Sequence, residues 1–213
     1  MFAYLTAAGL SASAGLNAYI PLLVVGLFSR FTDAVRVPDA FGWLTDWWAL
    51  CGMTLLLLVE LVVDKVPIVD HVNDILQTVV RPAAGGMVAA ATASAAELDE
   101  ATGTFLATTD TWTGWIVGGG IALIVHVAKA LTRTMINGGT LGFGAPVAST
   151  VEDAGSAGLS VLAVVVPILA GIALIFLAIL LWRLWLARRR RRRRRTLRRA
   201  AKQQQYGAAA PPP

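Results

Sequence analysis

The sequence predicts an all-α fold: a polytopic helical membrane protein with about six membrane segments, two of them broken by glycine and proline or re-entrant. Of the 213 residues, 56% are hydrophobic and only 15% are charged, and the mean hydropathy is +0.66. A soluble domain carries about 25% charged residues. The deficit comes from several long apolar runs, whereas a transmembrane barrel would need short alternating segments, which the sequence lacks.

Charge divides the chain into a body and a tail. Residues 183–213 carry twelve of the eighteen basic residues and no acid, so the tail has a charge of +12 and residues 1–182 have −7. We predict a helical membrane domain over 1–182 and a cytoplasmic arginine-rich tail over 183–213, whose low-complexity end predicts disorder. By the positive-inside rule we expect a multi-pass protein of the plasma (cytoplasmic) membrane with both termini cytoplasmic.

The first apolar stretch, residues 2–29, is long enough to span a membrane but is interrupted by glycines, serines, Asn17 and Pro21. Because proline lacks a backbone donor, we expect a broken, re-entrant or strongly kinked helix here. A polar loop over 30–46 follows. Residues 47–66 then form a membrane helix that begins with two tryptophans, which favour an interface.

Residues 67–81 are expected to form a short amphipathic helix that ends at Arg81-Pro82. Residues 83–96 are almost all small and suit close helix packing inside a bundle. The loop over 97–110 is acidic and has no basic residue, which predicts an outer position.

The remaining body contains three predicted segments. Residues 112–133 form a helix, residues 137–157 are a second stretch broken by glycine and proline, and residues 158–182 are the longest plain apolar run, which Pro167 can bend. The sequence leaves open whether residues 2–29, 83–96 and 137–157 cross the membrane fully.

Two predicted helices carry ionisable groups at matching depth. Glu60 lies thirteen residues after Trp47, and His126 lies fourteen residues after Trp112. At 1.5 Å per residue, both lie about 20 Å below the outer interface. Because an ionisable group inside a membrane segment is costly and is normally paired, we predict that Glu60 is a proton or cation site with His126 as its partner.

Further polar groups are expected to join this site. Asp64 is four residues after Glu60 and shares its side of the helix, and Lys129 and Arg133 continue the stripe that contains His126. The full set predicted to bind a substrate or a proton is Glu60, Asp64, Lys65, His126, Lys129, Arg133, Asn17, Ser149, Glu152 and Asp153. The competing interpretation is that the inner charges snorkel to water and that the acidic pair caps a helix.

Other chemistry is poorly supported. His71 with Asp70 and Asp74 lies on a predicted surface helix, so we expect no metal site, no cofactor and no catalytic residue. Cys51 is the single cysteine, which excludes an intrachain disulfide. An enzyme is the third class considered, and the absence of a nucleophile, a metal set or a cofactor motif argues against it.

The tail is expected to contact anionic lipid headgroups beside the last membrane helix. The predicted lipid contacts are Arg188, Arg189, Arg190, Arg191, Arg192, Arg193, Arg194 and Arg195. No folded reader or interleaved aromatic residue accompanies them, so we expect no specific nucleic acid binding.

Two groups of spaced residues carry a family resemblance. The first is Glu60-x3-Asp64-Lys65-x-Pro67-x2-Asp70, followed by Arg81-Pro82 and Gly85; the second is His126-x2-Lys129-x3-Arg133 and Gly144-Ala145-Pro146, followed by Ser149, Glu152 and Asp153. The combination resembles the bacterial membrane family named domain of unknown function 4126 over residues 5–180. The resemblance implies a small multi-pass membrane protein and no activity. The family has a basic residue after the early Gly-Leu, where this chain has Asn17.

Two functional hypotheses follow from the residues. The first is a transporter or carrier of a small polar or lipid-linked substrate, coupled to protons through the Glu/His/Lys cluster, because broken helices that meet intramembrane charges are typical of secondary transporters. The second is a structural or scaffolding membrane protein whose buried charges only stabilise the bundle. Small bundles of this kind often pair, so a homo-oligomer is a further expectation.

Overall fold

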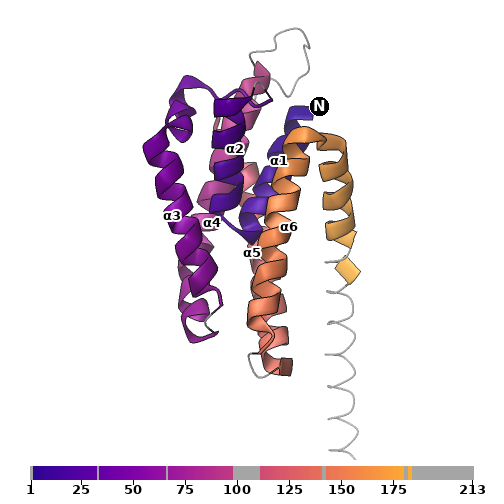
Figure 1. Cartoon of the computed structure of the whole chain (residues 1–213). Helices are drawn as coiled ribbons and strands as arrows, with labels where there is room; N and C mark the ends of the chain where they lie inside the picture. Colours follow the sequence, from indigo (N-terminus) through magenta and orange to yellow (C-terminus); the bar gives the residue numbers. More distant parts are fainter. Residues whose placement is uncertain are drawn as a thin grey trace, which may run out of the picture. The chain divides into compact units, whose positions relative to one another are not determined.

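A computed structural model describes residues 2–32, 34–65, 67–97, 111–140, 143–179 and 182–183 (Figure 1). Every regular element in these ranges is a helix, which confirms the all-α prediction. The predictions for the acidic loop and for the arginine tail lie outside the described residues. The chain divides into two compact units, residues 1–174 and 175–213. The fold and the site below concern the first unit, and the boundary predicted after residue 182 stays a prediction.

Unit 1 is a bundle of helices of unequal length. In chain order they are α1 (Phe2–Leu16), α2 (Tyr19–Phe31), the 3-10 helix η1 (Asp39–Thr45), α3 (Trp47–Val63), α4 (Pro67–Glu97), α5 (Thr111–Thr140) and α6 (Ala145–Val165). A further helix, Pro167–Ile179, begins in this unit. The helices predicted over 47–66 and 112–133 correspond to α3 and to most of α5.

The first apolar stretch is broken, as predicted, but the break lies at Asn17 rather than at Pro21. Pro21 stands in the first turn of α2, where its missing N–H needs no partner. Ser11 lies against Gly118 and Gly15 lies against Val125, so α1 runs parallel to α5. Figure 1 shows α2 returning toward the end of the bundle from which α1 started. The pair α1–α2 is therefore a hairpin whose turn lies inside the bundle.

One helix, α4, replaces the two segments predicted on either side of Pro82. The prediction that the helix ends at Arg81-Pro82 is wrong, because α4 continues through Pro82 to Glu97. Proline disfavours a helix at the residue before it. Here the Arg81 side chain is fixed by three other helices, and the small residues after Pro82 pack closely on α1 and α5, so tertiary packing outweighs the local preference.

The second predicted broken stretch, over 137–157, is divided in the structure, because α5 ends at Thr140 and α6 begins at Ala145. Its first part completes α5, and from Ala145 onward it belongs to the unbroken helix α6. Pro146 lies at the start of α6, a position that tolerates proline. The plain apolar run over 158–182 is instead interrupted at Val166, and a new helix begins at Pro167. Proline thus acts one residue before its own position, as its steric effect predicts.

Small residues form the centre of the bundle. Where α4 crosses α5, a Cβ added at Gly85 would lie 2.4 Å from the Ala122 Cβ, and one added at Gly118 would lie 2.4 Å from both the Ala89 Cβ and the Gly85 carbonyl oxygen. Such positions accept only glycine, and they let the two backbones approach as closely as in membrane helix pairs. The close packing predicted for residues 83–96 is therefore confirmed for Ala84–Ala91, which are buried except for Met87.

The outer surface of the bundle is apolar. Leu55, Val62, Ile116 and Ile124 are more than half exposed, as are many other large hydrophobic residues of α3, α4 and α5. One described helix, Trp112–Ile136, is long and apolar enough to cross a membrane. The pair η1 and α3, bent by 62°, would make a second if it formed one span. The count of six membrane segments therefore stays a prediction.

Candidate functional site

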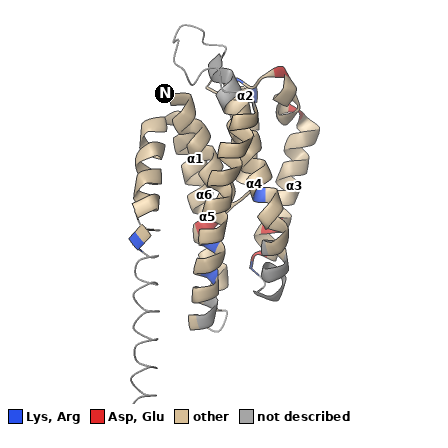
Figure 2. Cartoon of the chain, turned by 180° about the vertical axis from the view of Figure 1, so that it is seen from behind, with Lys and Arg blue, Asp and Glu red and all other residues tan. Residues whose placement is uncertain are grey.

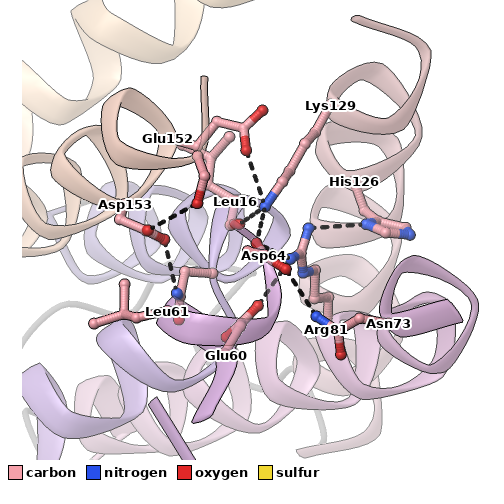
Figure 3. A network of polar contacts seen from close by, with 12 residues as sticks. Leu16, Glu60, Leu61, Asp64, Asn73, Arg81, His126, Lys129, Glu152 and Asp153 are labelled. Atoms are coloured by element: carbon pink, nitrogen blue, oxygen red, sulfur yellow. Dashed lines mark hydrogen bonds and ion pairs between the residues drawn. The ribbon is translucent and has the colours of Figure 1, made fainter. Parts of the chain in front are cut away.

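A network of buried ionisable side chains lies where α3, α4, α5 and α6 meet the turn of the α1–α2 hairpin (Figure 3). Figure 2 shows that the ribbon of α1 and of the first half of α5 carries no charged residue, so these charges are concentrated at one level of the bundle. We call them the charged network: Glu60, Asp64, Arg81, His126, Lys129, Arg133, Glu152 and Asp153. All are buried except Glu152, whose side chain is 14% exposed.

Asp64 is the carboxylate with the most partners. It follows the last residue of α3, and its Oδ2 accepts from Arg133 Nη2 at 3.0 Å and from Lys129 Nζ at 3.4 Å. Its Oδ1 accepts from Asn73 Nδ2 at 2.8 Å, and Arg81 Nη2 lies 3.9 Å from Oδ2. One buried carboxylate thus joins α3 to α4 and α5, which compensates the cost of burying the cations.

Arg81 lies between the two residues that were predicted to pair. Its Nη2 donates to Glu60 Oε1 at 2.8 Å, and its Nη1 lies 3.1 Å from His126 Nδ1. The predicted pairing of Glu60 with His126 is thus linked by Arg81, which contacts both. Because a guanidinium only donates, His126 Nδ1 must be the acceptor, and the imidazole is neutral. Its Nε2–H can then donate to Thr78 Oγ1, 3.1 Å away.

Glu152 closes the network from α6. Its Oε2 accepts from Arg133 Nη2 at 2.9 Å and from Arg133 Nε at 3.1 Å, and it lies 3.2 Å from Lys129 Nζ. Two cations thus converge on one carboxylate oxygen that solvent can reach in part. This is the arrangement that a bound carboxylate or phosphate group would require.

The hairpin turn supplies backbone groups to the same site. At the end of α1 the carbonyl oxygen of Leu16 accepts from Lys129 Nζ at 2.8 Å, and that of Gly15 accepts from Arg81 Nη1 at 3.4 Å. The last carbonyls of a helix have no partner in the helix and carry partial negative charge, so they favour these cations. The break in the first helix therefore takes part in the charge balance of the site.

Asn17 connects the turn to α6. Its Oδ1 accepts from the amides of Tyr19 and Ile20 at the start of α2, and its Nδ2 donates to Asp153 Oδ1 at 2.9 Å. The other oxygen, Asp153 Oδ2, lies 3.4 Å from Ser149 Oγ. Asp153 thus has neutral partners, unlike the other three carboxylates.

The structure brings together nine of the ten predicted site residues. The exception is Lys65, which lies just after α3, is exposed and donates to the carbonyl oxygen of Leu61 in the last turn of that helix at 2.9 Å. The alternative that Asp64, Lys129 and Arg133 snorkel to water is wrong, because all three are buried and paired within the bundle. The side chains of His71, Asp70 and Asp74 lie outside the described residues.

The sequence interpretation missed Arg81 as a member of the site. It was placed at a helix end because of Pro82, although it is fully buried. A signal was present: Gln77, Arg81, Ala84 and Val88 follow one another at spacings of four, three and four, which puts them on one side of a helix, and all are buried. A helix break assumed at proline hid this stripe.

Three buried side-chain atoms within the described residues have no hydrogen-bond partner: Glu60 Oε2, Gln77 Oε1 and Arg81 Nε. All belong to neighbouring residues, because Arg81 binds Glu60 and Gln77 lies one turn earlier on α4. Buried polar atoms are normally paired, so unpaired ones call for an explanation such as a water, an ion or a bound ligand. The group offers two acceptors and one donor.

Comparisons with known proteins agree with the motif resemblance. The family model described as Domain of unknown function (DUF4126) matches residues 4–187. No curated protein and no solved structure matches the chain.

Proposed function

The chain belongs to the family described as Domain of unknown function (DUF4126), whose name assigns no activity, and we propose a function from its own residues. It is a multi-pass membrane protein that carries a small polar or lipid-linked substrate through the charged network, with Glu60 as the proton or cation site.

The distribution of polarity supports a membrane location. The bundle buries Arg81, Arg133 and Asp64 while it exposes large hydrophobic residues, which is the reverse of a soluble protein. Exposed tryptophans gather at one end, where Trp43 stacks on Trp48 and Arg30 lies 4.5 Å above the Trp47 ring. Tryptophan and arginine in such a cluster suit the interface between headgroups and hydrocarbon.

The hairpin modifies the topology that the sequence suggested. Since α1 runs parallel to α5 and α2 turns back, residues 2–31 enter and leave the bundle at the end where α5 begins (Figure 1). The acidic stretch before α5 favours the outer side for this end. The N-terminus then lies outside, in contrast to the expectation that both termini are cytoplasmic, while the arginine tail stays assigned to the cytoplasm.

A single observation carries the carrier proposal: a helix break inside the bundle meets a charged network that retains an unpaired carboxylate oxygen, Glu60 Oε2. Discontinuous helices whose ends face buried charges are the common substrate sites of secondary transporters. In this proposal Lys129 and Arg133 bind an anionic group of the substrate, and Glu152, the most exposed member of the network, exchanges with it.

Native mass spectrometry of the protein, gently extracted from its own membranes, tests this function. Wild type is compared with Glu60→Gln, and with Asp39→Asn as a control at an exposed acid outside the network. We expect a discrete bound molecule in wild type and in Asp39→Asn that is lost in Glu60→Gln. A stable assembly without any bound molecule in all three would count against a carrier.

A structural role is the second candidate, and the internal pairing of Asp64, Lys129 and Arg133 favours it. Breaking a buried ion pair strands a charge and costs about 3–5 kcal/mol, whereas removing both partners costs much less. The structure changes the pair to be tested from Glu60 with His126 to Glu60 with Arg81. If the charges only stabilise the bundle, Glu60→Gln with Arg81→Met should recover the thermal stability that Glu60→Gln loses.

A further inference from the structure

The charged network contains one more acid than it has cations. Among the described residues, its four carboxylates are those of Glu60, Asp64, Glu152 and Asp153, and its basic side chains are Arg81, Lys129 and Arg133. His126 adds no charge, because its Nδ1 accepts from Arg81. With these groups ionised, the described residues of the network would together carry one negative charge in surroundings of low dielectric, where an uncompensated charge is strongly unfavourable.

The unpaired atoms indicate where a compensating proton would lie. Both oxygens of Asp64 accept hydrogen bonds, and Glu152 Oε2 accepts from Arg133. At Glu60, by contrast, Oε1 accepts from Arg81 and Oε2 has no partner, although the residue is only 3% exposed. A proton on Oε2 would remove the negative charge of Glu60. It would also make Oε2 a hydrogen-bond donor, which then needs an acceptor nearby.

Gln77 provides that acceptor. Its Oε1 is buried and also has no partner. Gln77 lies one turn before Arg81 on the same side of α4, and Arg81 donates to Glu60, so Gln77 and Glu60 are both neighbours of the Arg81 side chain. Among the described residues, Arg81 from α4, Lys129 from α5 and Asp64 act electrostatically on Glu60, and Glu60 acts on Tyr19 from α2.

We propose that the charged network holds one proton on Glu60 Oε2, which donates to Gln77 Oε1 directly or through one water molecule, and that Gln77 positions this proton. A bridging water would accept from both Glu60 Oε2–H and Arg81 Nε and donate to Gln77 Oε1, so it would satisfy all three unpaired atoms. The proposal deepens the function proposed for Glu60 by naming the proton as its ligand. It does not require that the protein transports a substrate.

Infrared spectroscopy of the full chain in lipid nanodiscs tests it. A protonated carboxylic acid gives a C=O stretch clear of the amide bands, and exchange into heavy water shifts it. We expect such a band at neutral pH in wild type. It should move when glutamate is labelled with carbon-13 and stay when aspartate is labelled. Isotope labelling assigns the proton without any substitution, so the test does not depend on a variant that folds.

Variants then locate the proton. Glu60→Gln should abolish the band, while Asp39→Asn, at an exposed acid outside the network, should retain it. Gln77→Leu removes the acceptor, so the band should shift to higher wavenumber or vanish. An unchanged band in Gln77→Leu would reject the role of Gln77. Absence of an acid band in wild type, or a band that follows aspartate labelling and disappears in Asp153→Asn, would overturn the proposal.

The two proposals fail in different ways. A Glu60 band in a protein that binds no molecule in native mass spectrometry would keep the proton and reject the carrier. If wild type binds a molecule that Glu60→Gln loses, but shows no acid band, the carrier would be kept and the proton on Glu60 rejected.

Discussion

Two regions of the bundle hold the same helices together by opposite means. In the first, which we call the small-residue region, α1, α4, α5 and α6 meet through Gly9, Ser13, Gly85, Gly118 and Ala163. In the second, the charged network, the same four helices and α3 meet through long ionisable side chains. Helix α1 belongs to both, because its first turns pack against glycine and alanine and its last carbonyls accept from Arg81 and Lys129.

The difference concerns what each region can change. In the small-residue region backbone meets backbone, so that even one added carbon atom has no room and the helices cannot shift without losing contact. In the charged network, one carboxylate accepts from several cations, and Lys129 has both Asp64 and Glu152 within 3.4 Å. A cation in the network can therefore change from one carboxylate to another with only a small movement of its side chain. A moving part of a carrier would therefore lie in the network, with the small-residue region as its fixed support.

The largest loss of stability is expected from a substitution of Asp64, the carboxylate of the network with the most partners. Asp64→Asn takes one of two shared carboxylates from Lys129 and Arg133 and leaves them Glu152, and weakening buried ion pairs in this way should cost up to about 3–5 kcal/mol. Thermal unfolding in nanodiscs measures the loss. Asp39→Asn, at an exposed acid of η1, is the matched control and should change stability by less than about 0.5 kcal/mol. Equal stability of the two variants would show that the network does not hold the bundle together.

The next effect breaks the small-residue region. Gly118→Leu would force a side chain against Ala89 and the Gly85 backbone, and overpacking of this kind costs about 1–3 kcal/mol. Gly120→Leu is the control two residues away, since no other residue lies within 4 Å of a Cβ added there. We expect thermal unfolding to separate the two variants clearly. If both leucines were tolerated equally, the close approach of α4 and α5 would have to be wrong.

A smaller effect sharpens the comparison inside the small-residue region. Ser13 Oγ lies within hydrogen-bond distance of Ser156 Oγ and Ser160 Oγ and of the Ser156 carbonyl oxygen, which links α1 to α6. Ser13→Ala removes these bonds and should cost about 1 kcal/mol. Thr134→Ala is the control, because the Thr134 hydroxyl is exposed and donates within its own helix to Ala130. If Ser13→Ala lost more stability than Asp64→Asn, the small-residue region would contribute more to stability than the charged network, contrary to the order proposed here.

The smallest effect marks the edge of the network. Lys65 stands one residue after Asp64 but is exposed and donates to the last turn of α3, so Lys65→Met should change stability by about 0.5 kcal/mol or less. Lys129→Met removes a buried cation that contacts Asp64, Glu152 and the end of α1, and should cost several times more. Comparable losses in the two variants would place Lys65 inside the network after all.

The sequence predicted the helical fold and most of the site because both depend on local pattern. Apolar runs mark helices, and the spacing of His126, Lys129 and Arg133 puts their side chains on one side of α5. The depth argument placed Glu60 and His126 at one level, and both do contact Arg81. What depth cannot show is which third residue lies between them, because that depends on how α4 packs against α3 and α5.

The failures all concern proline and tertiary contact. The sequence predicts a helix end at Pro82, yet Arg81 before it is held by Glu60, His126 and Gly15, and this outweighs the local preference. Conversely, the first helix breaks at Asn17 without a proline in the break, because Asn17 itself accepts from the next two free amides and donates to Asp153. The contacts of Arg81 and of Asn17 join segments that are far apart in the sequence, so the residue pattern of one segment cannot predict them.

The hairpin of α1 and α2 also sets the order in which the molecule can be completed. Its turn is fixed by Asn17 to Asp153, a contact 136 residues apart in sequence, and by Leu16 to Lys129, 113 residues apart. During synthesis the N-terminal segment emerges first, while the side chains that complete its turn emerge only with α5 and α6. Until then Asn17 and the last carbonyls of α1 lack their long-range partners. The hairpin therefore reaches its final structure only after α5 and α6 have been made, and a ribosome stalled before α6 would hold a hairpin in which Asn17 Nδ2 lacks Asp153 as its acceptor.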